Sequence, residues 1–193
     1  KYNQKSVISQ SEWEALRVDK MPKLKGKLFA GIKYGHDGTN VAMSIAVKTV
    51  NDDIFVESID CQSIRNGNAW IISFLKQADV QEVVIDGASG QNILANEMKD
   101  ARIKKPILPT VKEIIVANST FEQGLFQQTI KHTGQPSLSQ VVTNCDKRNI
   151  GSNGGFGYRS QIEENDIALM DSMILAHWAC STAKPAKKQK ISY

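Results

Sequence analysis

The chain has 193 residues, of which 41% are hydrophobic and 23% are charged, and its formal net charge is +4. This length and composition are typical of one soluble globular domain with a real hydrophobic core. No apolar run reaches the roughly 18 residues that a membrane helix needs, so no membrane span is predicted. The cysteines number three and form no C-x-x-C pair, which argues against a disulfide framework and for reduced thiols.

Residues 1–26 are polar and lack a sustained hydrophobic period, so we interpret them as a linker or an N-terminal arm. Within this segment, Ser11 to Leu16 fits a short helix that Met21-Pro22 would end. The sequence starts with Lys1 rather than Met, and we therefore expect a fragment or a processed product.

The predicted core domain covers residues 27–182 and begins with three strands, at 28–34, 41–50 and 54–59. The first two strands are joined by 35–38, which ends in an Asp-Gly hairpin signal. A second turn, at 51–53, joins the second strand to the third. Short turns connect antiparallel neighbours, so we expect these three strands to form an antiparallel group.

Strands and helices then alternate along the chain. Helices are predicted at 68–78, 90–101, 112–129 and 166–180, and strands at 81–86 and 106–109, with a Gly-rich hairpin at 148–160. This order predicts an α/β fold with a mixed five-stranded sheet, in which parallel strands follow three antiparallel ones and helices cover both faces. Residues 183–193 are predicted to be a basic disordered tail.

Two aspartates lie on apolar elements that are far apart in the sequence. Asp86 closes the buried run Val83-Val84-Ile85, and Asp171 shares a face of the last helix with apolar side chains. A buried carboxylate is costly unless it is paired or binds a metal, so the two acids together predict one site for divalent cations. The structural alternatives are that Asp86 caps the next turn and that Asp171 pairs with a Lys or an Arg. Asp166 lies about 140° around the helix from Asp171 and is interpreted as its N-terminal cap.

A third carboxylate is expected from the end of the first strand, where the sequence has Lys33 instead. The nearest acid is Asp37, which also suits a simple Asp-Gly turn. Three carboxylates (Asp37, Asp86 and Asp171) would suit two Mg²⁺ or Mn²⁺ ions. Lys33 would then either approach the scissile phosphate or offset the acidic charge, and the sequence leaves both open.

Four stretches, at 29–39, 83–87, 113–132 and 138–179, resemble the C-terminal nuclease domain of the large terminase subunit of tailed bacteriophages, which has a ribonuclease H-like fold. The resemblance implies that Asp86 is the strand acid of that family and Asp171 its final-helix acid. Many members carry Gly-x-Asp on the first strand, where this chain has Gly31-Ile32-Lys33. Some members place the acid a few residues later, before a glycine, which corresponds to Asp37.

The resemblance implies a metal-dependent endonuclease that cuts concatemeric double-stranded viral DNA during genome packaging in the host cytoplasm. It also implies the ATPase motor domain, the portal and the small terminase subunit as partners, and no membrane. The chain contains no G-x-x-x-x-G-K-[ST] motif, so we expect the motor to be absent from it.

The Gly-rich hairpin has basic flanks that are suited to the phosphates of a DNA backbone. We predict that Lys147, Arg148 and Arg159 make such contacts, which give affinity without sequence information. The alternative is that Arg148 and Arg159 pair with nearby acids such as Glu163 and Glu164.

The sequence leaves two rival functions open. The first is another ribonuclease H-like enzyme, such as a Holliday-junction resolvase or a transposase catalytic core, which would share the metal chemistry and differ in substrate. The second is a non-catalytic packaging or docking module whose metal site has decayed, and Lys33 is the residue that supports it.

Overall fold

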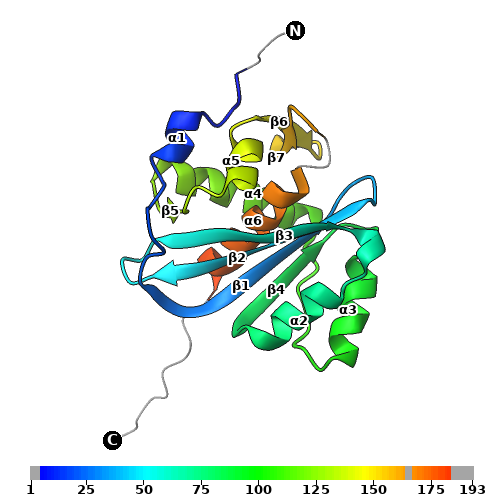
Figure 1. Cartoon of the computed structure of the whole chain (residues 1–193). Helices are drawn as coiled ribbons and strands as arrows, with labels where there is room; N and C mark the ends of the chain where they lie inside the picture. The colour runs from blue at the N-terminus through cyan, green and yellow to red at the C-terminus, as the bar shows by residue number, and fades with distance from the viewer. Residues whose placement is uncertain (1–4, 164–166, 184–193) are drawn as a thin grey trace, which may run out of the picture.

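The computed structural model describes residues 5–163 and 167–183, and its centre is a five-stranded mixed sheet (Figure 1). The strands follow the order β4-β1-β2-β3-β5 across the sheet. Strand β1 is antiparallel to β2 and β2 to β3, whereas β4 is parallel to β1 and β5 to β3. The predicted fold class is thus confirmed. The bounds are β1 Leu24–Tyr34, β2 Asn40–Thr49, β3 Ile54–Ser63, β4 Val80–Asp86 and β5 Ile130–Lys131.

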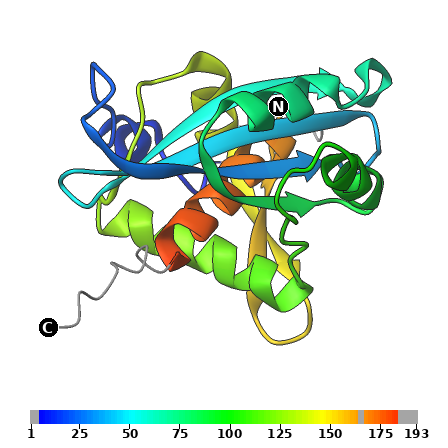
Figure 2. The ribbon, with the colours of Figure 1, turned by 90° about the horizontal axis from the view of Figure 1, so that it is seen from below.

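Helices cover both faces of this sheet, as the sequence predicted. Helices α2 (Ala69–Gln77) and α3 (Gln91–Asp100) pack on one face, where they bury Ile71, Leu75, Leu94 and Met98. On the other face, α6 (Ile167–Thr182) crosses the central strands, and α4 (Val111–Phe126) packs against α6. Figure 2 shows α6 between the sheet and α4. Buried on nearly every side, α6 is almost entirely apolar, which makes Asp171 stand out.

The fifth strand differs from the one predicted. Residues 106–109 form only an isolated parallel bridge, in which the Ile107 N–H donates to Val83 O at 2.8 Å and Ile107 O accepts from the Ile85 N–H at 2.9 Å. The flanking prolines have no N–H to donate, so the ladder goes no further. The fifth strand is instead β5. It follows α4, which ends at Phe126, earlier than the helix predicted for 112–129. Helix α5 (Pro136–Val142) was also not predicted.

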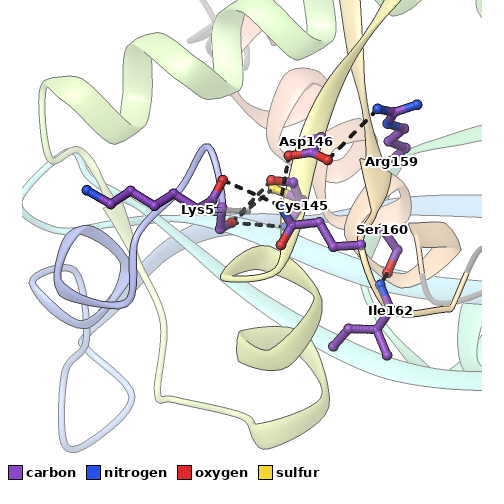
Figure 3. A network of polar contacts seen from close by, with 8 residues as sticks. Lys5, Cys145, Asp146, Arg159, Ser160 and Ile162 are labelled. Carbon is purple, nitrogen blue, oxygen red and sulfur yellow. Dashed lines mark hydrogen bonds and ion pairs between the residues drawn. The ribbon is translucent and has the colours of Figure 1, made fainter. Parts of the chain in front are cut away.

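The N-terminal segment packs into the domain from residue 5 onward. Ser9 caps helix α1 (Gln10–Glu14). Trp13 in this helix is 2% exposed, and its indole stacks on His132 with ring centroids 3.9 Å apart. The indole N–H also donates to Ser139 Oγ at 3.0 Å. Figure 3 shows a second attachment beside Lys5, where the Cys145 N–H at the start of strand β6 (Cys145–Ile150) donates to the Ser6 hydroxyl at 3.0 Å. The described part of the predicted arm therefore contributes to the hydrophobic core.

The contact between α6 and the sheet is unusually close at Gly31. A Cβ at this position would lie 2.5 Å from the Ala176 backbone nitrogen and closer still to the Ser172 carbonyl oxygen. Beside it, Ser44 Oγ and Ser172 Oγ are 2.7 Å apart, so small side chains line the floor on which the helix rests. Since Asp171 precedes Ser172, this contact fixes where Asp171 meets the sheet.

The predicted Gly-rich hairpin is present as strands β6 and β7 (Gly155–Ser160), which pair antiparallel. Glycine is needed here for close packing: a Cβ at Gly155 would lie 2.5 Å from Ile115 Cδ1 on α4. The hairpin is therefore held against α4 and is anchored on the same side of the sheet as α6. The predicted cap Asp166 and the predicted tail from residue 184 onward lie outside the described residues.

Candidate active site

The side chains at the carboxyl ends of β1 and β4 meet beneath α6. Alternation along β1 places Ala30, Ile32 and Tyr34 against α2 and α3, so Lys33 points to the α6 face. Lys33 is paired in register with Asp86 on the neighbouring parallel strand, which brings both side chains to the same edge of the sheet. In open α/β sheets, the carboxyl ends of parallel strands are the usual place for a ligand site.

Lys33 and Asp86 form a largely buried ion pair. Lys33 Nζ lies 2.5 Å from Asp86 Oδ2, and the two side chains are 7% and 21% exposed. Such a pair resists the loss of either partner, because the remaining charge would be buried alone. Of the two roles that the sequence left open for Lys33, this ion pair corresponds to the one in which Lys33 offsets the acidic charge.

Asp171 reaches the same place from α6. It lines one small cavity of about 20 Å³ together with Lys33, Asp86 and Arg148, and with Asn118 and apolar side chains of α4 and α6. Burial raises the pKa of Asp171 to about 6, the positive charges of Lys33 and Arg148 oppose this rise, and the negative charge of Asp86 adds to it. The two acids are 85 positions apart by their numbers (171 minus 86), and the fold brings them together.

Asp37 does not line this cavity. It is exposed in the loop between β1 and β2, where its Oδ1 accepts from the backbone N–H of Thr39 at 3.0 Å and from the Thr39 hydroxyl at 2.8 Å. Within the described residues, no three His, Cys, Asp or Glu side chains gather so that they could hold a metal ion. The three-carboxylate set therefore stays a prediction.

The three basic residues predicted to bind DNA have different surroundings. Lys147 Nζ lies 2.5 Å from Glu122 Oε2 and 4.1 Å from the centroid of the Phe156 ring. Arg159 is exposed, with Nη2 3.9 Å from Asp146 Oδ2, a separation that Figure 3 marks. Glu164, one of the acids predicted to pair with an arginine, lies outside the described residues.

Arg148, by contrast, belongs to the cavity itself. It lies opposite Gly157 in the hairpin, and a Cβ at Gly157 would come within 3.5 Å of both Arg148 Nε and Asn118 Nδ2. Arg148 Nε and Asn118 Nδ2 therefore lie close to the same point of the hairpin, which places the guanidinium beside α4. The sequence placed Arg148 only on a flexible DNA-binding hairpin and missed its position next to the acids.

Asn118 was missed altogether by sequence reasoning. It lies on the buried face of α4 with Ala117, Phe121 and Leu125, and is a polar residue among mainly apolar ones. That placement is a weak signal, because an isolated asparagine on a helix is more often a satisfied core residue. Its significance depends on the cavity, which only the packing of five separate segments (β1, β4, α4, β6 and α6) creates.

Two further observations bear on the class of protein. Within residues 5–163 and 167–183, no helix combines the length and the apolar character that crossing a bilayer requires. No family model and no curated protein sequence matches the chain significantly.

The solved structures that match include large terminases of bacteriophages. The large terminase nuclease of thermophilic phage G20c is 14% identical with a TM-score of 0.62, over 94% of this chain and 100% of that one. The nuclease domain of the large terminase subunit of bacterial virus Sf6 is 12% identical with a TM-score of 0.61, again over 94% and 100%. The large terminase of bacteriophage HK97 is 13% identical with a TM-score of 0.62, over 90% of this chain but 43% of that one.

Some of these nucleases were solved with divalent cations. The G20c nuclease has structures with bound magnesium and with bound cobalt, and a mutant of the Sf6 domain has structures with manganese and with calcium. At 12–14% identity the likeness concerns the fold, and the chain spans less than half the length of the HK97 protein. This chain has the fold of the nuclease domains of bacteriophage large terminase subunits.

Proposed function

We propose that this domain is a divalent-metal-dependent endonuclease that hydrolyses phosphodiesters in double-stranded DNA, as the nuclease domain of a terminase large subunit. The observation that carries the proposal is the convergence of Asp86 and Asp171 in one cavity with Lys33 and Arg148, on this fold. We further propose concatemeric viral DNA as substrate and the host cytoplasm as location. The motor domain, portal and small subunit are its proposed partners.

The oxygen atoms that line the cavity are suitable ligands for a hard cation. Asp86 and Asp171 offer carboxylate oxygens, and the Asn118 Oδ1 is a buried acceptor with no hydrogen-bond partner in the described part of the chain. Mg²⁺ and Mn²⁺ prefer such oxygen ligands, with water completing the shell. The cavity volume of about 20 Å³ is the room that one water molecule needs, so it supports one ion in this arrangement. The predicted second ion would need a further ligand such as Asp37.

When bound, such a cation lowers the pKa of water and neutralises charge on the leaving oxygen of a phosphodiester. The side chains supply the positioning and the electrostatic balance. Asp86 and Asp171 together carry two negative charges, and Lys33 and Arg148 carry two positive ones. The cavity is therefore neutral before a cation enters, and it carries two positive charges afterwards. That surplus complements the extra negative charge that develops on phosphorus during hydrolysis.

Each basic residue has a proposed role. Arg148 is the best placed of the three hairpin cations to approach the scissile phosphate, because it lines the cavity. Lys147 and Arg159 lie on the same hairpin and would contact phosphates farther along the backbone, which requires Lys147 to exchange its contact with Glu122 for a phosphate. Lys33 holds Asp86 in place until the cation and the substrate bind.

The test is plasmid nicking with Mn²⁺. Asp86→Ala and Asp171→Ala should each abolish nicking while the protein remains folded, as judged by circular dichroism. Asp146→Ala is the matched control, because it removes an aspartate from the base of the hairpin that does not line the cavity. Full activity in either of the first two variants would refute the assignment.

One observation favours a second candidate, a non-catalytic DNA-packaging module. The Lys33 ammonium lies 2.5 Å from Asp86 Oδ2, so it neutralises the carboxylate in the way that a bound cation would. Calorimetric titration with Mn²⁺ separates the two candidates. The nuclease should bind Mn²⁺ through Asp86 and Asp171, whereas a packaging module with this internal cation should bind none.

A further inference from the structure

Asn118 is a buried asparagine with only half of its amide satisfied. Its side chain is on α4 and the residue is 4% exposed. The amide nitrogen Nδ2 donates to the Ile114 carbonyl at 2.9 Å, while the Oδ1 has no hydrogen-bond partner among residues 5–163 and 167–183. A buried acceptor left unpaired costs roughly 1–3 kcal/mol, so native proteins seldom keep one without a reason.

The orientation of this amide is fixed by its own hydrogen bond. The Ile114 carbonyl can only accept, so the group that faces it must be Nδ2. Nδ2 also faces the hairpin, since a Cβ at Gly157 would lie 3.5 Å from it. The Oδ1 occupies the other branch of the planar amide, on a side chain that lines the cavity with Asp86 and Asp171.

Neither cationic side chain of the cavity donates a hydrogen bond to Asn118 Oδ1 within the described residues. Lys33 Nζ is held by Asp86 Oδ2. No hydrogen bond joins Arg148 to Asn118 Oδ1 among the described residues. A lone acceptor next to two carboxylates has the chemistry of a ligand for a hard cation, and the amide carbonyl of asparagine is one of the oxygen ligands such ions take.

We propose that Asn118 Oδ1 is the third protein oxygen that binds the divalent cation held by Asp86 and Asp171. In this chain the end of β1 offers the ammonium of Lys33, so α4 supplies the third oxygen instead. A neutral amide adds a ligand without adding charge, which preserves the two positive charges that favour the phosphate. This inference rests on the proposed function, because it concerns the same cation.

The experiment is calorimetric titration of the whole chain with Mn²⁺, supported by the electron paramagnetic resonance spectrum of bound Mn²⁺. Asn118→Leu keeps the size of the side chain and removes the oxygen. Asn118→Asp restores an oxygen ligand and adds a negative charge. Asn96→Leu is the matched control, because Asn96 is an exposed asparagine on α3, on the other face of the sheet. Thermal unfolding in EDTA establishes that each variant is folded.

We expect Asn118→Leu to lower Mn²⁺ affinity at least tenfold, the lower end of what metal-site partners usually contribute. Asn118→Asp should bind Mn²⁺ at least as tightly as the parent, and Asn96→Leu should match it. Unchanged affinity in Asn118→Leu, together with loss of binding in Asp171→Asn, would overturn the role of Asn118 and leave the proposed function standing. No Mn²⁺ binding by the parent chain would overturn both.

Discussion

Replacing Gly31 by alanine tests whether the close contact between β1 and α6 builds the site. The φ angle of Gly31 is not in the left-handed region, so the backbone itself accepts alanine. Without a clash, Gly31→Ala would stabilise the protein by about 0.4–1 kcal/mol, because it reduces the entropy of the unfolded chain. The sign of the effect is therefore decided entirely by what the new methyl group meets.

That methyl group meets the backbone of α6. It would lie 2.5 Å from Ala176 N and closer to Ser172 O, where ordinary contacts are 3.4–4 Å. Backbone atoms in the middle of a helix cannot rotate away, so α6 must move by roughly 1 Å as a body. Overpacking of this kind costs about 3 kcal/mol, the upper part of the usual range. For a chain of this size, that corresponds to a fall in Tm of roughly 6–12 °C.

Thermal unfolding followed by circular dichroism measures the change. Gly26→Ala is the control, because Gly26 has a φ of +87° but nothing within 4 Å of its Cβ position. It should cost about 1–2 kcal/mol from backbone strain alone. Gly31→Ala should also weaken Mn²⁺ binding, since Asp171 moves with Ser172, whereas Gly26→Ala should not. A Tm for Gly31→Ala equal to or above that of the parent would refute the reasoning.

Four further outcomes are expected. The pKa of Asp171 is raised from an ordinary 3.8 to about 6. Between these pH values the folded state therefore binds more protons than the unfolded state, so the free energy of unfolding should fall as the pH rises from about 4 to 6. Asp171→Asn should remove this slope in EDTA, and an unchanged slope in a pH series of Tm values would contradict the assignment. Lys33→Met should lower the free energy of unfolding in EDTA by about 3 kcal/mol, because it leaves Asp86 without its buried partner, and added Mn²⁺ should restore much of that loss. Denaturant titration with and without Mn²⁺ measures both effects. A variant as stable as the parent in EDTA would contradict this role of the ion pair. Arg148→Ala should weaken DNA binding and reduce the salt slope of the affinity by about one, so a slope identical to that of the parent would remove Arg148 from the DNA contacts. Trp13→Ala should destabilise the domain by about 3–5 kcal/mol in the same titration, since it empties a buried site beside His132, whereas a change below about 1 kcal/mol would mean that the arm is dispensable.

Much of the architecture follows from local patterns in the sequence. The Asp-Gly turn, the alternating strands and the amphipathic helices predicted a mixed sheet with helices on both faces, and the structure confirms it. The errors fell on short elements. Strand β5 has two residues, too few to show a period of two, and it exists because β3 offers Ile54 and Phe55 as partners.

The sequence by itself singled out Asp86 and Asp171 as candidate site residues, because a carboxylate in an apolar element is conspicuous wherever that element lies in the fold. It did not determine which groups surround them. Lys33 was seen only as a departure, Arg148 only as part of a hairpin, and Asn118 not at all, although all three line the cavity with the two acids.

Tertiary structure determined which residues line the cavity, through close contacts between elements that no local sequence pattern indicates. Gly31 lets α6 rest on β1, and the packing of the hairpin near Gly157 brings Arg148 beside Asn118 of α4. A glycine in a sequence indicates freedom, but which backbone approaches it depends on the packing of the whole domain. The composition of the cavity is therefore a property of the assembled layers, because side chains from five separate segments meet only when those layers pack together.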